Sequence, residues 1–430
     1  MVIPAILKIL IVFFSMLAFT RLKVPLGVAI AFGGIILNLW AGAGIDNTLS
    51  TVFKTVTSLP FWLMLFVTSL IFEFGRYLSK PKNSQGIISI AYRLGGRHGK
   101  TWGLISIPAI IGLVPMPAGA LFSAPIVDKT AGDGPWTPTW KAAVNYWFMH
   151  TWEYWWPLYP GIILSLAIFD VRVNQFIKGQ IPFTIASVLV GYLFLIRPYS
   201  RYLTVKDPLK STTGVSEGLK ATIPLLVLTP CIFIFPGIFE RLMPNTDPQA
   251  VRLIAMLAGI ALALVPVWLD ERKQDKNEFL EGILSTKSLN ISVTVAGILL
   301  FQALLKSSDL LPIAREDLHA SGVPIVVIIA VLPLLSGFVT GLALGFAGTA
   351  FPLVAMLYET GSVNLPLSAV IALAYGFGYM GMMLSPVHLC LLVTSDYFNV
   401  RIFRIYRAIG LCIIVMTLFT ILASWLYGLM

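Results

Sequence analysis

The chain has little charge and little cysteine. Charged residues make up 12% of its 430 residues, against about a quarter in soluble globular proteins. Together with 57% hydrophobic residues, this deficit indicates that lipid rather than water is the main solvent. The three cysteines, Cys231, Cys390 and Cys412, lie in apolar runs without metal-ligand spacing and are interpreted as packing residues. No metal or cofactor is therefore expected, apart from Na⁺ or H⁺ as a coupling ion.

Catalytic and nucleotide-binding motifs are scarce as well. The sequence matches neither the metalloprotease pattern H-E-x-x-H nor the P-loop pattern G-x-x-x-x-G-K-[ST]. His150 and Glu153 alone do not make a catalytic constellation, so the chain is not expected to be an enzyme or an ATP-driven pump. The net charge of +10 is assigned to loops beside a membrane and not to nucleic-acid binding.

Apolar runs account for most of the length. At about 20 residues per crossing, the runs predicted to span a bilayer are 3–20, 24–41, 60–75, 137–168, 181–197, 221–238, 252–269, 288–305, 365–394 and 402–428. Two further runs, 101–127 and 323–357, are interrupted by Pro and Gly and are predicted to be re-entrant hairpins. This assignment places 21 of the 30 Lys and Arg residues on one face. That face is predicted to be cytoplasmic, with both termini outside an inner (plasma) membrane.

The two halves of the sequence align without gaps at a constant offset, so that position 112 of the first half corresponds to position 341 of the second. Segments 112–172 and 341–401 share thirteen identities in 61 positions at this spacing. Each half holds five crossings and one hairpin, and an odd number of crossings inverts the second half relative to the first. The predicted fold is an all-α polytopic membrane protein of two inverted repeats, 1–200 and 220–430, joined by a cytoplasmic linker, 201–219.

The hairpin tips are the first candidate binding elements. They are predicted to turn over 114–120 (VPMPAGA) and 345–352 (GFAGTAFP), because Pro and Gly interrupt a helix there. Backbone groups freed at membrane depth need protein, water or a ligand to satisfy them. Free N–H groups and helix N-termini at two facing tips would bind an anion, and free carbonyls a cation. The competing interpretation is a pair of kinks where small residues let helices pack closely.

The helices that follow the hairpins are the second candidate. Each contains a matched proline, Pro157 and Pro386, which predicts a break near the midplane. His150 and Glu153 are three residues apart and so share a helix face. Ionisable residues at membrane depth usually face a cavity or a partner, which favours ion or proton coupling for Glu153; a buried pair with His150 is the alternative. His150 and His388 bind substrate or serve as packing histidines.

Other polar and aromatic residues have simpler interpretations. Glu73 is expected at the membrane interface, and Asp128 at a helix terminus or loop. A tryptophan cluster forms either an interfacial belt or the wall of a pocket; its members are Trp147, Trp152, Trp155 and Trp156.

The tips and broken helices resemble a known family. The run 115–125 (PMPAGALFSAP) and the run 385–388 (SPVH) are similar to the domain of unknown function family 401 (DUF401). This family is placed within the ion transporter superfamily of gluconate, citrate and C4-dicarboxylate permeases. The resemblance covers nearly the whole chain and implies a homodimer, with a dimerising scaffold domain and a hairpin-bearing transport domain that moves as an elevator. The Ser-Asn-Thr signature of the sodium–dicarboxylate members is absent from both tips.

The predicted function is secondary transport of a small, carboxylate-like organic anion, coupled to Na⁺ or H⁺. The candidate substrate-binding residues are Pro117, Ala118, Gly119, Ser123, Asn145, His150, Gly348, Thr349, Ser385 and His388. No Lys or Arg lies at the centre of either motif, so dipoles, a co-bound cation or a protonated histidine would neutralise the anion. The alternative is a cation/proton antiporter in which Glu153 binds the ion.

Overall fold

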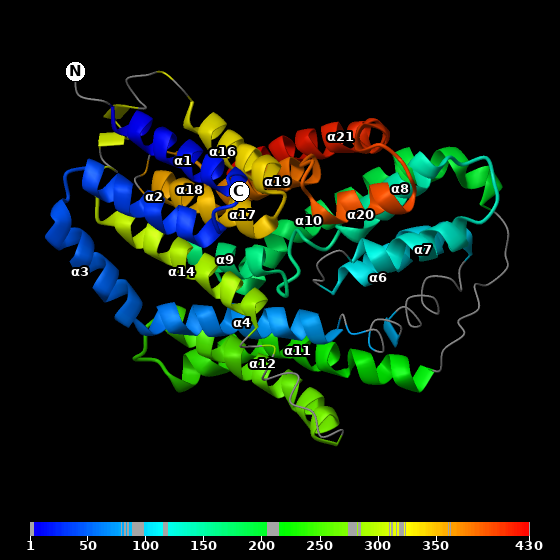
Figure 1. Cartoon of the computed structure of the whole chain (residues 1–430), viewed down its shortest axis with the longest axis horizontal. Helices are drawn as coiled ribbons and strands as arrows, with labels where there is room; N and C mark the ends of the chain where they lie inside the picture. The colour runs from blue at the N-terminus through cyan, green and yellow to red at the C-terminus, as the bar shows by residue number, and fades with distance from the viewer. Residues whose placement is uncertain are drawn as a thin grey trace.

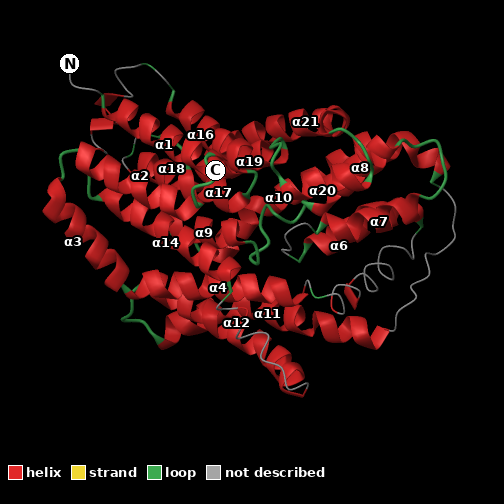
Figure 2. Ribbon diagram, viewed as in Figure 1, coloured by secondary structure: helices red, strands yellow, loops and turns green. Residues whose placement is uncertain are grey.

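The described part of the chain is helical. The computed structural model describes residues 4–429 except 79, 81–82, 84–85, 88–98, 115–118, 204–214, 274–281, 283–284, 309, 311–312, 315, 318–321, 323, 360 and 362. Within these residues there are helices and loops but no strand (Figures 1 and 2).

The helices of the first half are α1 (Ala5–Arg21), α2 (Leu26–Trp40), α3 (Gly44–Thr57), α4 (Leu59–Leu78), α6 (Lys100–Gly112), α7 (Ala120–Ala131), α8 (Pro138–Met149), α9 (Pro160–Ile168) and α10 (Val173–Gly191). Those of the second half are α11 (Val215–Leu242), α12 (Pro248–Lys273), α14 (Thr286–Lys306), α16 (Ile325–Thr340), α17 (Ala343–Thr349), α18 (Phe351–Glu359), α19 (Leu367–Met383), α20 (Leu389–Tyr397) and α21 (Ile402–Gly428).

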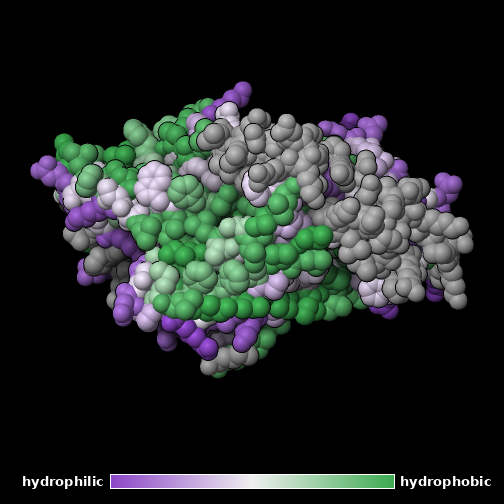
Figure 3. All heavy atoms as spheres, turned by 90° about the horizontal axis from the view of Figure 1, so that it is seen from below, coloured by the Kyte–Doolittle hydropathy of each residue, from purple (hydrophilic) through white to green (hydrophobic). Residues whose placement is uncertain are grey.

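The helices have the length and surface of membrane spans. Six helical stretches among the described residues are long and apolar enough to cross a bilayer, and α2, α16 and α19 are shorter apolar helices. The outer side of α21 exposes large apolar side chains such as Leu418 and Trp425. Seen from below the view of Figure 1, a broad apolar surface is bordered by polar side chains (Figure 3). The chain is a multi-pass helical membrane protein.

The contacts between helices divide the fold into two groups. The first group comprises α1–α4, α11, α12 and α14, in which α2 packs on α14, and α4 on both α12 and α14. Glycine permits the close crossing of α2 and α14, because a Cβ on Gly27 would lie 2.2 Å from the Val293 carbonyl oxygen. The second group comprises α6–α10 and α16–α21, and it contains both predicted hairpins and both broken helices. Figure 1 shows α4, α11 and α12 together along one side of the molecule.

Helix boundaries recur at the spacing found in the sequence. Helices α8 and α19 begin at equivalent positions of the two halves, Pro138 and Leu367, and α9 (Pro160–Ile168) corresponds end to end to α20 (Leu389–Tyr397). The left-handed residues Asp170 (φ 51°) and Asn399 (φ 49°) follow at the same spacing. These helix boundaries therefore agree between the halves, while the repeat itself, its inverted orientation and the division at 201–219 remain predictions.

The second hairpin turns earlier than predicted. Its chain reverses at Gly341, which has a left-handed φ of 67°, and residues 343–349 form helix α17 where the tip was placed. The prediction of a turn over 345–352 is therefore wrong. Pro352 is the second residue of α18, where a missing N–H removes no helical hydrogen bond. In the first half α6 ends at Gly112 and α7 begins at Ala120, so these helix ends flank the predicted turn, of which residues 115–118 lie outside the described residues.

Two smaller features also differ from what the sequence suggested. Residues 44–57 form the amphipathic helix α3, which contains no apolar run and was not predicted, with exposed Ile45 and Phe53 on its surface. Glu73, which was expected to be interfacial, is fully buried in the protein, and its carboxylate accepts a hydrogen bond from Arg76. Asp128 lies in the last turn of α7 and pairs with Lys141 at 2.6 Å, as expected of a residue at a helix terminus.

Candidate functional site

The candidate site is built around the breaks in two helices. Helix α8 ends at Met149, and the chain runs through successive turns until α9 begins at Pro160. Helix α19 ends at Met383, and α20 begins at Leu389. Pro157 and Pro386 fall inside these interruptions, and a proline has no N–H to continue a helical ladder. Carbonyl groups at both breaks therefore need partners from elsewhere in the protein.

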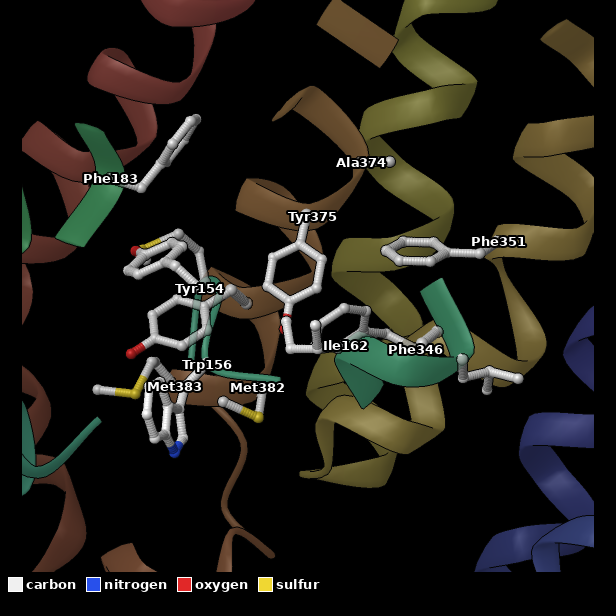
Figure 4. Packing of buried hydrophobic residues seen from close by; sticks show 14 of the residues in the cluster. Tyr154, Trp156, Ile162, Phe183, Phe346, Phe351, Ala374, Tyr375, Met382 and Met383 are labelled. Carbon is white, nitrogen blue, oxygen red and sulfur yellow. The ribbon is translucent and has the colours of Figure 1, made fainter. Parts of the chain in front are cut away.

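A tyrosine of each half donates a hydrogen bond to a backbone carbonyl at the helix break of the other half. Tyr146 of α8 donates its hydroxyl to the Met383 carbonyl at 2.9 Å, and Tyr375 of α19 donates to the Glu153 carbonyl at 2.6 Å. Tyr146 and Tyr375 are equivalent positions of the repeat, so the exchange is reciprocal. Figure 4 shows Tyr375 and Met383 with the surrounding buried side chains.

Side chains also donate hydrogen bonds to backbone carbonyls where the first arm of each predicted hairpin ends. Tyr159 donates its hydroxyl to the carbonyl of Gly112, the last residue of α6, and Trp156 Nε1 donates to the carbonyl of Leu113 at 2.9 Å. In the second half, His388 Nδ1 lies 2.9 Å from the carbonyl oxygen of Gly341. The broken helices therefore satisfy the backbone where each hairpin arm ends.

A histidine pair lies at the centre of this arrangement. His150, which caps the end of α8, and His388, which caps the start of α20, are both buried, and their Nε2 atoms are 2.9 Å apart. His150 Nδ1 lies 2.6 Å from the Tyr146 carbonyl oxygen. Because a carbonyl oxygen only accepts, Nδ1 of each histidine must carry a hydrogen. If both rings are neutral, both Nε2 atoms are unprotonated and their lone pairs face one another.

Glu153 lies beside this pair. Its Oε1 atom is 3.8 Å from His150 Nε2, and the residue is 9% exposed. The contact is longer than a hydrogen bond, so the carboxylate is close to the pair without being bonded to it. The sequence 142–171 contains no Lys or Arg, nor does 343–400, so no cation of these segments pairs with Glu153.

Three other predicted site residues are close to the breaks. Ser123 Oγ lies 3.3 Å from the sulfur of Met149, the last residue of α8. Asn145 donates to Thr394 Oγ1 of α20 at 3.1 Å. Ser385 is fully buried inside the α19–α20 break, close to the left-handed Gly341.

The remaining predicted residues are not brought to the histidine pair. A Cβ on Gly348 would lie 2.3 Å from the Ile298 side chain, so this residue faces α14 of the first group. Thr349 bonds to the Gly345 carbonyl at 2.9 Å and to Ser336, both within the second hairpin. Gly119 is the buried residue before α7, whereas Pro117 and Ala118 lie outside the described residues.

Cys390 is the residue that the sequence interpretation missed. It is half-buried in the first turn of α20, and its sulfur lies within 4.8 Å of the candidate ligand nitrogens of both histidines. The available signal was the His388-Leu389-Cys390 spacing. Neither of the other two cysteines has a histidine so close in sequence, which is why the three together resemble packing residues.

Two of the four tryptophans are buried in the protein interior, and Trp152 and Trp155 are partly buried. Trp147 is 2% exposed and donates to the Ser187 carbonyl at 2.9 Å, and Trp156 is 8% exposed. Some polar atoms beside them are buried without a hydrogen-bond partner among the described residues: Asn145 Oδ1, Trp152 Nε1, Tyr154 OH and Trp155 Nε1. Such atoms normally find a partner, so these donors and acceptors are available to a polar ligand.

One catalytic sequence pattern occurs in the chain, but without the secondary structure that it requires. Residues 214–218 read G-V-S-E-G, a match to the hydrolase pattern G-x-S-x-G. That motif needs a serine at a sharp strand-to-helix turn. Ser216 instead follows the first residue of helix α11 in an all-helical region of the described chain.

Comparison with known proteins identifies a family and a fold. A family model described as "Protein of unknown function (DUF401)" matches residues 6–236 and 248–430. No curated protein matches. The crystal structure of the Alcanivorax borkumensis YdaH transporter, described as having an unusual topology, is similar at a TM-score of 0.50 and 14% identity. This similarity covers 94% of the present chain and 97% of the transporter chain, and at this identity it concerns the fold alone.

Proposed function

The chain belongs to the DUF401 family, and we propose that it is a secondary active transporter of a small, carboxylate-like organic anion. Transport would be coupled to Na⁺ or H⁺ across the inner membrane. The observation that carries this proposal is the meeting of two broken helices at the His150–His388 pair, where the Nε2 atoms are 2.9 Å apart. Discontinuous helices with buried polar groups are a recurrent architecture of substrate sites in secondary transporters.

The site offers hydrogen-bond donors and acceptors but no fixed cationic side chain in the sequence around it. The unpartnered indole and hydroxyl groups of Trp152, Trp155 and Tyr154 supply donors for carboxylate oxygens. Ser123, Asn145 and Ser385 add polar groups close to the breaks, and Glu153 is the candidate residue for the coupling cation. Helix dipoles, a co-bound cation or a protonated histidine would neutralise an anion in this setting, and the last two couple its movement to a cation.

The division into two helix groups is compatible with the proposed elevator mechanism. The group of α1–α4, α11, α12 and α14 would form a dimeric scaffold, and the group with hairpins and broken helices would move as the transport domain. Among the described residues, ion pairs that join the groups include Lys306 with Glu359 at 2.9 Å and Arg252 with Asp170. Both involve exposed side chains, and such pairs contribute little to stability and can exchange during a movement.

The test is a binding and transport assay on the purified full chain. Thermal unfolding would be measured against carboxylates, phosphonates and sulfonates, with and without Na⁺, because a ligand that binds the folded state raises the unfolding temperature. A stabilising anion would then be tested for gradient-driven uptake into proteoliposomes. Uptake that persists without any cation gradient, or that fails for every stabilising anion, would contradict coupled anion transport.

The second candidate is a cation/proton antiporter that uses Glu153. It is favoured by the position of this carboxylate, 9% exposed and 3.8 Å from a histidine nitrogen. Proteoliposomes without organic solute separate the two functions: cation exchange driven by a pH gradient supports the antiporter and contradicts anion symport.

A further inference from the structure

The His150–His388 pair has a geometry that two neutral histidines cannot hold alone. Each Nδ1 donates to a backbone carbonyl, at 2.6 Å for His150 and 2.9 Å for His388. In two neutral rings the Nε2 lone pairs would therefore face each other across 2.9 Å, which is repulsive unless a proton or a metal ion lies between or beside them. Both rings are buried, so bulk water does not screen this repulsion.

The same geometry is typical of histidines that bind a metal ion. A metal-ligating histidine nearly always donates its other ring N–H to a carbonyl or carboxylate, which fixes the tautomer and the ring orientation. Tyr146 and Gly341 provide that carbonyl here, one to each ring. The Tyr379 hydroxyl also donates to the His150 carbonyl at 2.8 Å, which fixes the backbone that carries the first ring.

A third ligand lies at the same place. The Cys390 sulfur and one nitrogen from each histidine are all within 4.8 Å of one another, a separation that one ion can bridge with a small side-chain adjustment. Zinc bonds are about 2.0–2.1 Å to nitrogen and about 2.3 Å to sulfur. Two nitrogens 2.9 Å apart would then subtend about 90° at the ion. The ion would therefore widen the pair by a few tenths of an ångström toward a tetrahedral angle.

We propose that His150, His388 and Cys390 form a binding site for a borderline-soft divalent ion of the zinc class. Imidazole and thiolate ligands select such ions, whereas Mg²⁺ and Ca²⁺ prefer all-oxygen sites. Three protein ligands leave a fourth position open, as in zinc sites that bind a small molecule. On the premise of the proposed transport function, an oxygen of the anion occupies this position, and the ion supplies the positive charge that the surrounding sequence lacks.

The experiment uses the full-length protein purified in detergent and measures the metal directly. Metal would be removed with a chelator and Co²⁺ added as a spectroscopic probe of the zinc site. The expected result is one Co²⁺ per chain, with visible bands of a tetrahedral ion and a thiolate-to-cobalt band in the near ultraviolet. Zinc should compete for the same site, and elemental analysis of the untreated protein should find it.

Matched variants identify the ligands. Cys390→Ser should remove the thiolate band, while Cys231→Ser and Cys412→Ser, which make the same change elsewhere, should leave it intact. His150→Gln and His388→Gln should each weaken binding at least about tenfold, since losing even an outer-shell partner costs 10- to 100-fold. If a histidine variant fails to fold, the cysteine series still decides the assignment.

The outcomes separate metal binding from transport. Folded wild-type protein that binds neither Co²⁺ nor zinc overturns the proposal and leaves a proton shared between the histidines. A cobalt spectrum unchanged by Cys390→Ser also overturns it. Neither result depends on uptake, so the metal site and the transport function can fail independently.

Discussion

Tyr159 and His388 are equivalent positions of the two halves, and each donates a hydrogen bond to the carbonyl of a glycine where a hairpin arm ends. The two glycines, Gly112 and Gly341, are themselves equivalent. The residue type of the donor differs between the halves, but the contact is the same. In the second half this place is taken by a histidine, which adds a ring nitrogen that can contact His150.

The first prediction concerns the orientation of the halves. Arg172 and Arg401 are exposed, equivalent positions that precede α10 and α21. If the repeats are inverted, they lie on opposite faces of the membrane. A cysteine in place of Arg172 should react with an impermeant maleimide added to intact cells, whereas one in place of Arg401 should react only after permeabilisation.

The wild-type chain, with its three native cysteines, gives the background for this labelling. Reaction of both new cysteines from the same side would show that the halves are parallel. That result would contradict both the predicted inverted repeat and the predicted exterior position of the two termini.

The second prediction concerns the glycines where the hairpin arms end. A Cβ on Gly341 would lie 2.9 Å from Ser385 Oγ at a φ of 67°, and one on Gly112 would lie 1.9 Å from the Met149 carbonyl oxygen. Gly341→Ala should destabilise the protein by about 2–4 kcal/mol, from left-handed strain and overpacking together. Gly112→Ala should force α6 away from α8. Both should lower the unfolding temperature in detergent.

Gly410→Ala is the matched control, because no atom lies within 4 Å of its Cβ position in α21. Alanine is a better helix former than glycine, so this variant should be neutral or slightly more stable. Equal destabilisation by all three substitutions would mean that the close approach at the breaks is not the cause.

The sequence predicted the parts of this fold that depend on local pattern. Long apolar runs gave α4, α12, α14 and α21 nearly to their ends. Proline and the matched spacing located the breaks in 137–168 and 365–394.

The features that the sequence did not predict depend on tertiary contacts. Gly345 and Gly348 resemble turn residues, but they are small so that α17 can pack against Thr340 and Ile298. Helix α3 has no apolar run because only one side of it is apolar. The contact between His150 and His388 joins residues 238 positions apart, which no single-sequence pattern specifies.

The third prediction concerns the tyrosines that bond to the opposite break. Tyr146→Phe and Tyr375→Phe each remove one donor, to the carbonyls of Met383 and Glu153 respectively. Each substitution should lower the stability of the folded protein by about 1 kcal/mol, the range found for hydrogen bonds between membrane helices.

Tyr406→Phe is the control, since its buried hydroxyl has no partner among the described residues and its loss should leave the stability unchanged. Thermal unfolding of the three variants compares these costs directly, and an equally large effect at Tyr406 would show that loss of the hydroxyl itself is responsible.

The fourth prediction concerns the coupling residue. Glu153→Gln keeps the size of the side chain but removes its negative charge beside the histidine pair. If this carboxylate binds the coupling cation, the variant should lose gradient-driven accumulation by at least about tenfold, because a buried charge partner is commonly worth about 1.4 kcal/mol or more. Exchange of internal for external substrate, which needs no gradient, should be retained.

Glu359→Gln makes the same change at a half-exposed ion pair with Lys306 and should leave accumulation nearly unchanged. Accumulation at the wild-type level in Glu153→Gln would place the coupling cation elsewhere, and loss of exchange as well would assign Glu153 to substrate binding instead of coupling.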